Sequence, residues 1–376
     1  MAQRRIGHLR PVKVPSIVVR HPALAWIAPA AVAVVLAAVA MGAFTSSSST
    51  ASLPETNPRA LIAGVSAAAK SPSRGYSGTI VVDASLGDQA GDSSASGSTT
   101  PTATDGAGAL DSFTTMLTGP HTLRFWYGGP ERQRVALLRP TSETDFFHVG
   151  DDLWEWDSAS QVVRHSKASA DGSWALPLTF AVLTPQQLAA HALSAIDDTT
   201  AVALGDQQIV ADRPCYQLVI TPQQGQSRIA SVRISVDSKT KVPLSVQVYA
   251  RGGTGPAVDA SFTTVRFKHP APSNFTPPTG HSPSSSQAGP SAVQGDGFTT
   301  VVEYAGSAAQ LDGMASALLR PVTGTFGSGE LLESPLLCLL ALADGRVYLG
   351  SVDPSALYQA AADGASVATA GTTRPR

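Results

Sequence analysis

The sequence predicts an α+β protein: a curved antiparallel sheet that forms an open half-barrel around two or three helices, after one N-terminal transmembrane helix. Three observations predict this fold. Residues 24–44 are apolar and contain no charged residue. Beyond residue 75, short β-branched and aromatic segments alternate with turn-type pairs, whereas few segments have helical periodicity. An antiparallel sheet of about ten strands usually curls or closes, so we expect the helices to lie against its concave side.

The segment 24–44 is long enough to cross a bilayer as a helix, for which about 20 apolar residues suffice. A basic flank without acidic residues precedes it in residues 1–23, with Arg4, Arg5, Arg10, Lys13 and Arg20. Basic flanks remain in the cytoplasm, so we expect a single-pass protein of the cell membrane whose bulk is extracytoplasmic. Alternatively, the segment is a long secretory signal that is cut near Ala51, and the protein is secreted.

Composition limits the partners. The chain has 376 residues and a formal net charge of −2, and removing the five positive charges of the basic flank leaves −7 on the exported part. This charge disfavours a nucleic-acid partner, which would require a basic face. The two cysteines, Cys215 and Cys338, are too few for a disulfide framework. They form either one disulfide or two separately buried thiols.

Composition shifts divide the chain into domains and linkers. Stretches rich in Ser, Thr, Gly and Pro cannot bury enough apolar surface to offset their ordering entropy. We therefore expect a spacer at 45–57, a main domain at 58–269 with a disordered insertion at 87–108, a linker at 270–297, a small C-terminal α+β piece at 298–363 and a disordered tail at 364–376.

Within the main domain, the first predicted helix covers residues 58–70, with Pro58 in its first turn. The second covers 184–196, with Thr184 as N-cap and Pro185 at its first position. A short helix or loop is expected at 110–117. Predicted strands are 76–86, 121–127, 132–138, 144–149, 153–157, 162–166, 208–211, 215–221, 230–237, 242–250 and 260–267. The C-terminal piece should contain a strand at 298–304, a hairpin at 337–350 and a helix at 354–362.

No pattern of residues indicates catalysis. The segment 75–78 has the wrong spacing for a nucleophile elbow, and the glycine-rich segment 324–329 lacks the Lys-Ser/Thr ending of a phosphate loop. The histidines show no spacing typical of metal sites, although His148 and His165 could face each other across the strands. We therefore expect no enzyme activity, no metal and no cofactor.

Aromatic residues gather instead on the strands between residues 125 and 174. Most of them are accounted for by an ordinary core. Trp154 and Trp156, however, share one strand face, and tryptophans beside a thin helical layer are typical of an apolar ligand cavity. The candidates for lining such a cavity are Phe125, Val135, Leu137, Phe147, Trp154 and Trp156.

The segment 143–157 resembles a pattern of LolA-type lipoprotein carriers and their actinobacterial, membrane-anchored relatives. In that family a strand ends at a Gly-containing turn and the next strand opens with Leu-Trp, positions taken here by Gly150, Leu153 and Trp154, followed by Trp156 and Asp157. The hairpin turn at 237–240 also fits the family. The resemblance covers about residues 58–267, and the anchor, the insertion and the piece from residue 298 depart from it.

The resemblance implies a half-barrel whose helices cover an apolar cavity for acyl chains. The predicted function is thus a membrane-tethered extracytoplasmic domain that binds lipid or lipoprotein acyl chains without catalysis. One alternative is an envelope-stress sensor that resembles anti-sigma cofactor domains and contacts an unknown membrane protein. Another is a purely structural surface domain.

Overall fold

The structure, a computed structural model, describes residues 53–71, 75–85, 118–167, 184–279, 291–304 and 319–370. Residues 51–376 form one compact unit, separate from residues 1–50. Within the described ranges, no helix combines the length and the hydropathy that crossing a membrane requires. The predicted anchor at 24–44, the insertion at 87–108 and the segment 110–117 lie outside these ranges.

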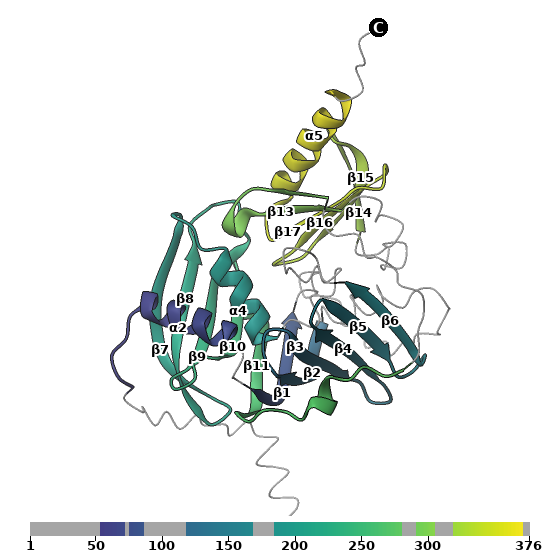
Figure 1. Cartoon of the computed structure of the whole chain (residues 1–376). Helices are drawn as coiled ribbons and strands as arrows, with labels where there is room; N and C mark the ends of the chain where they lie inside the picture. The colour runs from purple at the N-terminus through teal and green to yellow at the C-terminus, as the bar shows by residue number, and fades with distance from the viewer. Residues whose placement is uncertain are drawn as a thin grey trace, which may run out of the picture. The chain divides into compact units, whose positions relative to one another are not determined.

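The main sheet has eleven strands, all paired antiparallel, in the order β6-β5-β4-β3-β2-β1-β11-β10-β9-β8-β7 (Figure 1). The edge strands β6 and β7 are not paired with each other, so the sheet is open, as predicted. Its strands are β1 Tyr76–Ser85, β2 Thr118–Tyr127, β3 Arg132–Leu138, β4 Glu143–Val149, β5 Asp152–Asp157, β6 Val162–Lys167, β7 Thr200–Val210, β8 Arg213–Pro222, β9 Ile229–Asp237, β10 Pro243–Ala250 and β11 Pro256–Arg266.

Several strands are longer than the sequence pattern predicts, and β7 and β11 gain the most at their starts. β7 begins at Thr200 rather than at residue 208, and β11 begins at Pro256 rather than at residue 260. The added part of β7 is rich in Ala, Gly and Asp, which have low strand propensity. It is a strand because it pairs with β8 from Thr200 to Gly205, a tertiary contact that local propensity does not reveal.

Both predicted helices of the main domain are present, and the predicted cap at Thr184 is confirmed. Helix α2 covers Pro58–Lys70, and the side chain of Asn57 accepts a hydrogen bond from the backbone N–H of Ala60. Helix α4 covers Pro185–Ser194 and begins with a capping box between Thr184 and Gln187. These side chains satisfy N–H groups that a helix start leaves without partners.

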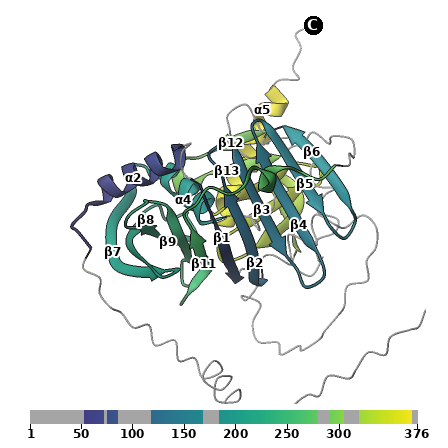
Figure 2. The same cartoon turned by 60° about the horizontal axis from the view of Figure 1, so that its bottom comes forward.

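Helices α2 and α4 pack on one face of the β7–β11 half of the sheet, which we call the helix-bearing face (Figures 1 and 2). Leu61 and Val65 of α2 and Ala189 of α4 are buried against apolar side chains of β8, β9 and β10. Those strand residues alternate with side chains that point to the opposite face. The core therefore lies between these helices and the sheet.

The β9–β10 hairpin is closed by Asp237, as the family pattern predicts. Its carboxylate accepts hydrogen bonds from the backbone N–H of Thr240 at 2.6 Å and from the Thr240 hydroxyl at 2.7 Å. Arg213 of β8 binds the same carboxylate through Nε, 2.6 Å from Oδ1, and through a second nitrogen, 3.1 Å from Oδ2. Asp237 is fully buried, so the hairpin encloses an ion pair.

The C-terminal part forms a second sheet of six strands in the order β12-β13-β17-β16-β15-β14, with α5 on one face. Its elements are β12 Ala292–Gln294, β13 Val301–Tyr304, β14 Leu319–Gly324, β15 Gly327–Glu333, β16 Cys338–Leu342, β17 Val347–Gly350 and α5 Pro354–Ala370. Two short 3-10 helices, η3 Pro272–Phe275 and η4 Gly297–Thr299, precede its central strands.

This second sheet contacts the connection between β8 and β9. The backbone N–H of Arg228 donates to Ser351 at 2.9 Å, and the Arg228 guanidinium bonds Glu333 at 2.9 Å. Phe298 and Leu336 are buried in the same cluster as the helices of the main domain. The C-terminal piece therefore shares part of its core with the main domain.

The two cysteines are separately buried free thiols. Burial raises the pKa of Cys215 to about 12 and that of Cys338 to about 11. Both thiols are therefore protonated at neutral pH and act as small apolar residues. This excludes the disulfide that the sequence left open.

Candidate functional site

The six predicted cavity residues lie on two faces of the sheet. Phe125 pairs with Val135, and Val135 pairs with Phe146, so these side chains point to the helix-bearing face together with Leu137. Phe147 is one residue further along β4 and therefore points to the opposite face. Trp154 and Trp156 pair with Phe147 and Asp145 and share that opposite face. The register thus brings the six residues together as two groups of three.

The first group belongs to a packed aromatic core. The ring of Phe125 lies 5.8 Å from that of Tyr76 and 6.3 Å from that of Phe262, with tilted or edge-on geometry. Tyr76 also stacks on Tyr127, whose hydroxyl donates to the carbonyl of Ala69 at the end of α2. Val135 and Leu137 are each 1% exposed. Edge-to-face aromatic packing of this kind adds to area burial, so these side chains hold the sheet to α2.

The apolar character of the helix-bearing face continues beyond the helices. α4 contacts β10 and β11 and α2 contacts β7, and both helices reach the buried cluster on β1–β3 through Ala68 and Leu188. Phe146 and Leu153 extend this face to β4 and β5 and are half-buried. On β2, opposite Val82, the buried Nε2 of His121 has no hydrogen-bond partner among the described residues. An unpaired buried nitrogen at the rim of an apolar face is a position for a ligand's polar end.

In the second group, Phe147 packs against Arg134 on the opposite face. The Arg134 guanidinium lies 4.6 Å from the ring centre of Trp126 and 5.1 Å from that of Phe147. It forms two 2.8 Å hydrogen bonds to Asp145, which is 1% exposed. Burial raises the pKa of Asp145 to about 6, although the hydrogen bonds from Arg134 lower it. At neutral pH the pair is ionised, and it fixes the two rings.

Trp154 stacks on His165 with the ring centres 4.0 Å apart. Nε2 of His165 lies 2.6 Å from Asp152, which also pairs with Lys167 at 2.7 Å. Hydrogen bonds from Lys167 and His165 lower the pKa of Asp152. His148 pairs with Leu153 and so lies on the helix-bearing face, which separates it from His165. The prediction that His148 and His165 could face each other is therefore wrong.

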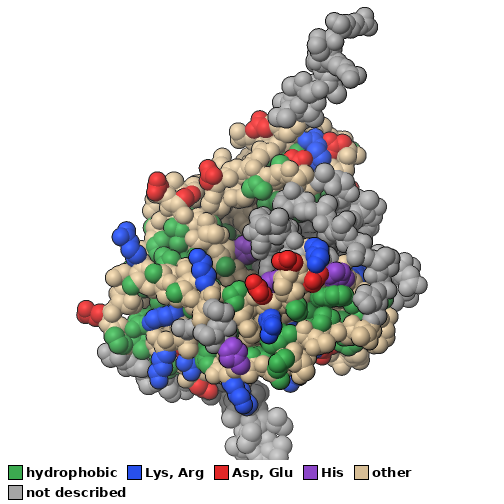
Figure 3. Space-filling view, viewed as in Figure 1, with side chains coloured by type: hydrophobic (Ala, Val, Ile, Leu, Met, Phe, Trp, Pro, Cys, Tyr) green, Lys and Arg blue, Asp and Glu red, His purple; other side chains and the backbone are tan. Residues whose placement is uncertain are grey.

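The described residues contain no group of His, Cys, Asp or Glu side chains that could hold a metal ion. Charges on the visible surface are mixed: Figure 3 shows Lys and Arg side chains interspersed with Asp and Glu rather than gathered into a basic patch.

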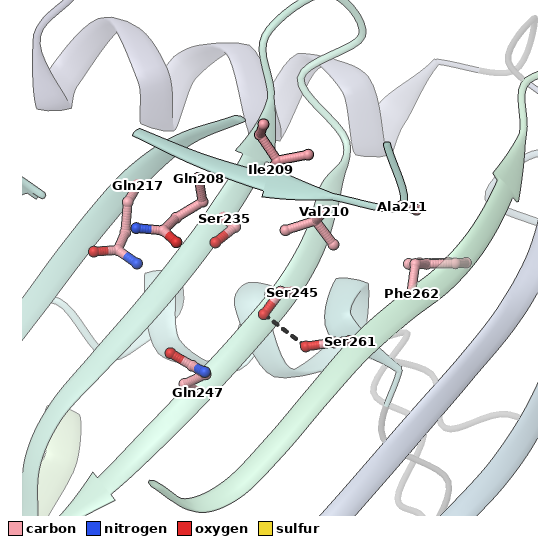
Figure 4. A pocket seen from close by; sticks show the side chains of 10 residues that line it. All are labelled: Gln208, Ile209, Val210, Ala211, Gln217, Ser235, Ser245, Gln247, Ser261 and Phe262. Atoms are coloured by element: carbon pink, nitrogen blue, oxygen red, sulfur yellow. Dashed lines mark hydrogen bonds between the residues drawn. The ribbon is translucent and has the colours of Figure 1, made fainter. Parts of the chain in front are cut away.

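A polar cavity lies on the face opposite the helices, beneath the end of β7 (Figure 4). It encloses about 300 Å³. β7 is the edge strand and pairs with β8, but it also contacts β11, which lies three strands beyond β8 in the sheet. It reaches β11 because its pairing with β8 is interrupted after Gly205, where it bends across the face of the sheet. The lining residues are Gln208, Ile209, Val210, Ala211, Gln217, Ser235, Ser245, Gln247, Ser261 and Phe262.

Sequence reasoning missed this cavity. Ser235, Ser245 and Gln217 occupy alternate positions of strands whose other positions are apolar, a pattern that predicts a solvent-facing side. The row formed by Gln217, Ser235, Ser245 and Ser261 is visible only once the register is known. One signal was available: several residues on these alternate positions are uncharged, whereas a solvated face usually carries Lys and Glu.

No family model and no curated protein matches this chain. Solved structures do match it. MucB in the complex structure of Pseudomonas aeruginosa MucA/MucB is 15% identical over 80% of this chain and 96% of that one, with a TM-score of 0.43. A LolA superfamily protein from Nitrosomonas europaea is 10% identical over 59% of this chain and 99% of that one, with a TM-score of 0.25.

A putative outer membrane lipoprotein-sorting protein domain from Vibrio parahaemolyticus is 10% identical over 57% of this chain and 94% of that one, with a TM-score of 0.26. Since all three TM-scores lie below 0.5, we base the function on the residues of this chain alone. The structures to which this chain is similar thus include LolA-superfamily and lipoprotein-sorting proteins, as the sequence resemblance predicted.

Proposed function

We propose that this chain is a binding protein without catalytic activity that takes up an acyl chain of a lipid or lipoprotein on its helix-bearing face. The observation that carries this proposal is the extension of the apolar cluster from the helices across β1–β3 to Phe146 on β4. Phe146 and Leu153 provide apolar contacts at its rim, and His121 offers a buried nitrogen to the polar end of the ligand.

The domain would work outside the cytoplasm, tethered by residues 24–44. Five basic residues before this segment and none directly after it support that orientation. A reporter enzyme that is active only outside the cytoplasm, fused after Phe267, is expected to be active. Activity of a cytoplasm-dependent reporter at the same position would contradict the tethered topology.

Acyl binding is tested by photo-crosslinking the full-length chain in cells that are fed a palmitate analogue carrying a diazirine. We expect labelled peptides from β2–β5. Leu153→Glu should reduce the labelling severalfold, because an unpaired carboxylate facing hydrocarbon is strongly disfavoured. Ile209→Glu is the matched control, since Ile209 is 51% exposed on β7 and lies away from this face.

The acyl proposal would be wrong if wild-type labelling were no higher than in cells without the chain. The proposal would also be contradicted if Leu153→Glu and Ile209→Glu reduced the labelling equally. Thermal unfolding of the variants separates lost binding from lost folding.

A second candidate function is recognition of a membrane-protein partner, as in a sensor or regulator. It is favoured by the half-buried Trp126, Trp154 and Trp156 on the opposite face, since Trp and Arg are enriched among residues that dominate protein interfaces. Under this alternative, Trp156→Ala would abolish capture of the partner and leave acyl labelling unchanged.

A further inference from the structure

We propose that the cavity beneath β7 is a binding site for a small uncharged polyhydroxyl ligand of about hexose size. Its volume of about 300 Å³ falls at the lower end of small-molecule sites, roughly 300–1,000 Å³. Its polar row lies on the face opposite the helices, whereas its wall residue Phe262 also packs in the aromatic cluster on the acyl-site face.

The first argument is the unused hydrogen-bonding capacity of the lining. Gln217 and Ser235 are 8% and 5% exposed, and their side chains have no hydrogen-bond partner among the described residues. The polar atoms of these two side chains are reached from the cavity, so they are available to bond a ligand there. Gln217 Oε1 lies close to Gly205, where the Cβ of any other residue would collide with it.

The second argument is the direction of the hydrogen bonds behind the lining. Gln247 Nε2 donates to Asp259 at 2.8 Å, and Ser261 Oγ lies within hydrogen-bonding distance of the same carboxylate. Ser261 Oγ is also 2.8 Å from Ser245 Oγ (Figure 4). A hydroxyl has one proton, and that of Ser261 goes to the charged Asp259, so Ser245 donates to Ser261. The lone pairs of Ser245 are then left to accept from a ligand.

The lining therefore offers donors and acceptors together. The amide of Gln217 and the hydroxyl of Ser235 can each donate and accept, and Ser245 can accept. Among the described residues, no Lys, Arg or His lines the cavity, which disfavours a phosphate or carboxylate. Hydroxyl groups, which both donate and accept, match this mixture best.

The third argument is the apolar part of the wall. Val210 of the bent strand and the ring of Phe262 add apolar surface to the lining, whereas Ile209 is 51% exposed and points away from the polar row. A sugar or cyclic polyol has hydroxyls at its rim and C–H groups on its ring faces, so it can satisfy both walls at once. An acyl chain would leave Gln217 and Ser235 buried and unpaired, which disfavours it here.

The test uses the full-length chain in nanodiscs. Glucose, myo-inositol and glycerol are the neutral probes, and their binding is measured by saturation-transfer NMR. Phosphate and acetate are the anionic probes, and their binding is measured by isothermal titration. We expect saturable binding of at least one neutral probe and none of the anions. Ser235→Val and Gln217→Leu should each weaken it about tenfold, equivalent to ~1.4 kcal/mol. Ser231→Val, on the same strand but outside the lining, is the matched control and should bind as wild type.

Absence of binding by every neutral probe, with the chain folded, would overturn the proposal. So would preferential binding of the anions, or equal affinities of Ser235→Val, Gln217→Leu and Ser231→Val. Acyl labelling is measured on a different face and with a different probe, so failure of one proposal does not imply failure of the other.

Discussion

Replacing Asp237 by alanine is expected to lower the free energy of unfolding by about 3–5 kcal/mol, as for other buried ion pairs that lose one partner. The carboxylate is fully buried, binds Arg213 through two hydrogen bonds and closes the β9–β10 turn through Thr240. Without it, the Arg213 charge and the turn N–H groups have no acceptor. Urea unfolding of wild type and variant at pH 7 measures the loss.

Asp344→Ala is the matched control. Asp344 also sits in a hairpin turn and pairs with an arginine, but its side chain is 53% exposed. Exposed pairs of this kind contribute only about 0–1 kcal/mol. Equal losses for the two variants would show that the buried pair has no special role.

The difference between wild type and Asp237→Ala should also depend on pH. Burial alone would raise the pKa of Asp237, but the hydrogen bonds from Arg213 and Thr240 lower it below its ordinary value. A carboxyl with a depressed pKa in the folded state stabilises the protein above the unfolded pKa of about 3.9, and this contribution is lost as the pH falls through the folded value. The difference should therefore be largest at neutral pH and shrink in acid.

Leu137→Ala is expected to cost about 2–5 kcal/mol of unfolding free energy, the range for large-to-small changes in packed cores. Leu137 is 1% exposed and belongs to the cluster that contains Phe125 and Tyr76. Removing its isopropyl group leaves a cavity that rigid neighbouring strands cannot fill. Denaturant unfolding gives the cost directly.

Leu204→Ala on β7 is the comparison, because Leu204 is 38% exposed and should lose less than about 0.5 kcal/mol. A similarly small cost for Leu137→Ala would mean that Leu137 borders empty space. In that case the acyl site would reach as far as β3 instead of ending at the rim formed by Phe146 and Leu153.

The local elements could be predicted from the sequence because their causes are local. Thr184 and Pro185 begin a helix whatever surrounds them, since a side-chain oxygen caps the first turn and proline fits its first position. The turn at Asp237 is likewise encoded by its own hydrogen bonds. The first half of β7 could not be predicted, because its residues are strand only through pairing with β8.

The candidate sites could be predicted only in part. Alternation predicted that Trp154 and Trp156 point to the same side of their strand, and that Val135 and Leu137 do so on theirs. The structure confirms both predictions. Which strand positions face each other depends on turn lengths, and a shift of one residue exchanges the two faces. That is why Phe147 and both tryptophans lie opposite the other three candidates.

The sequence by itself determined the antiparallel strands, the capped helices and the hairpin turn at Asp237, because each follows from the preferences of neighbouring residues. The tertiary structure alone decided which apolar side chains share a face, that both cysteines are separate thiols, and that β7 bends over a polar cavity. These features depend on contacts between residues far apart in the chain, such as β7 with β11. Local patterns carry no information about such contacts until the strand order and register are set.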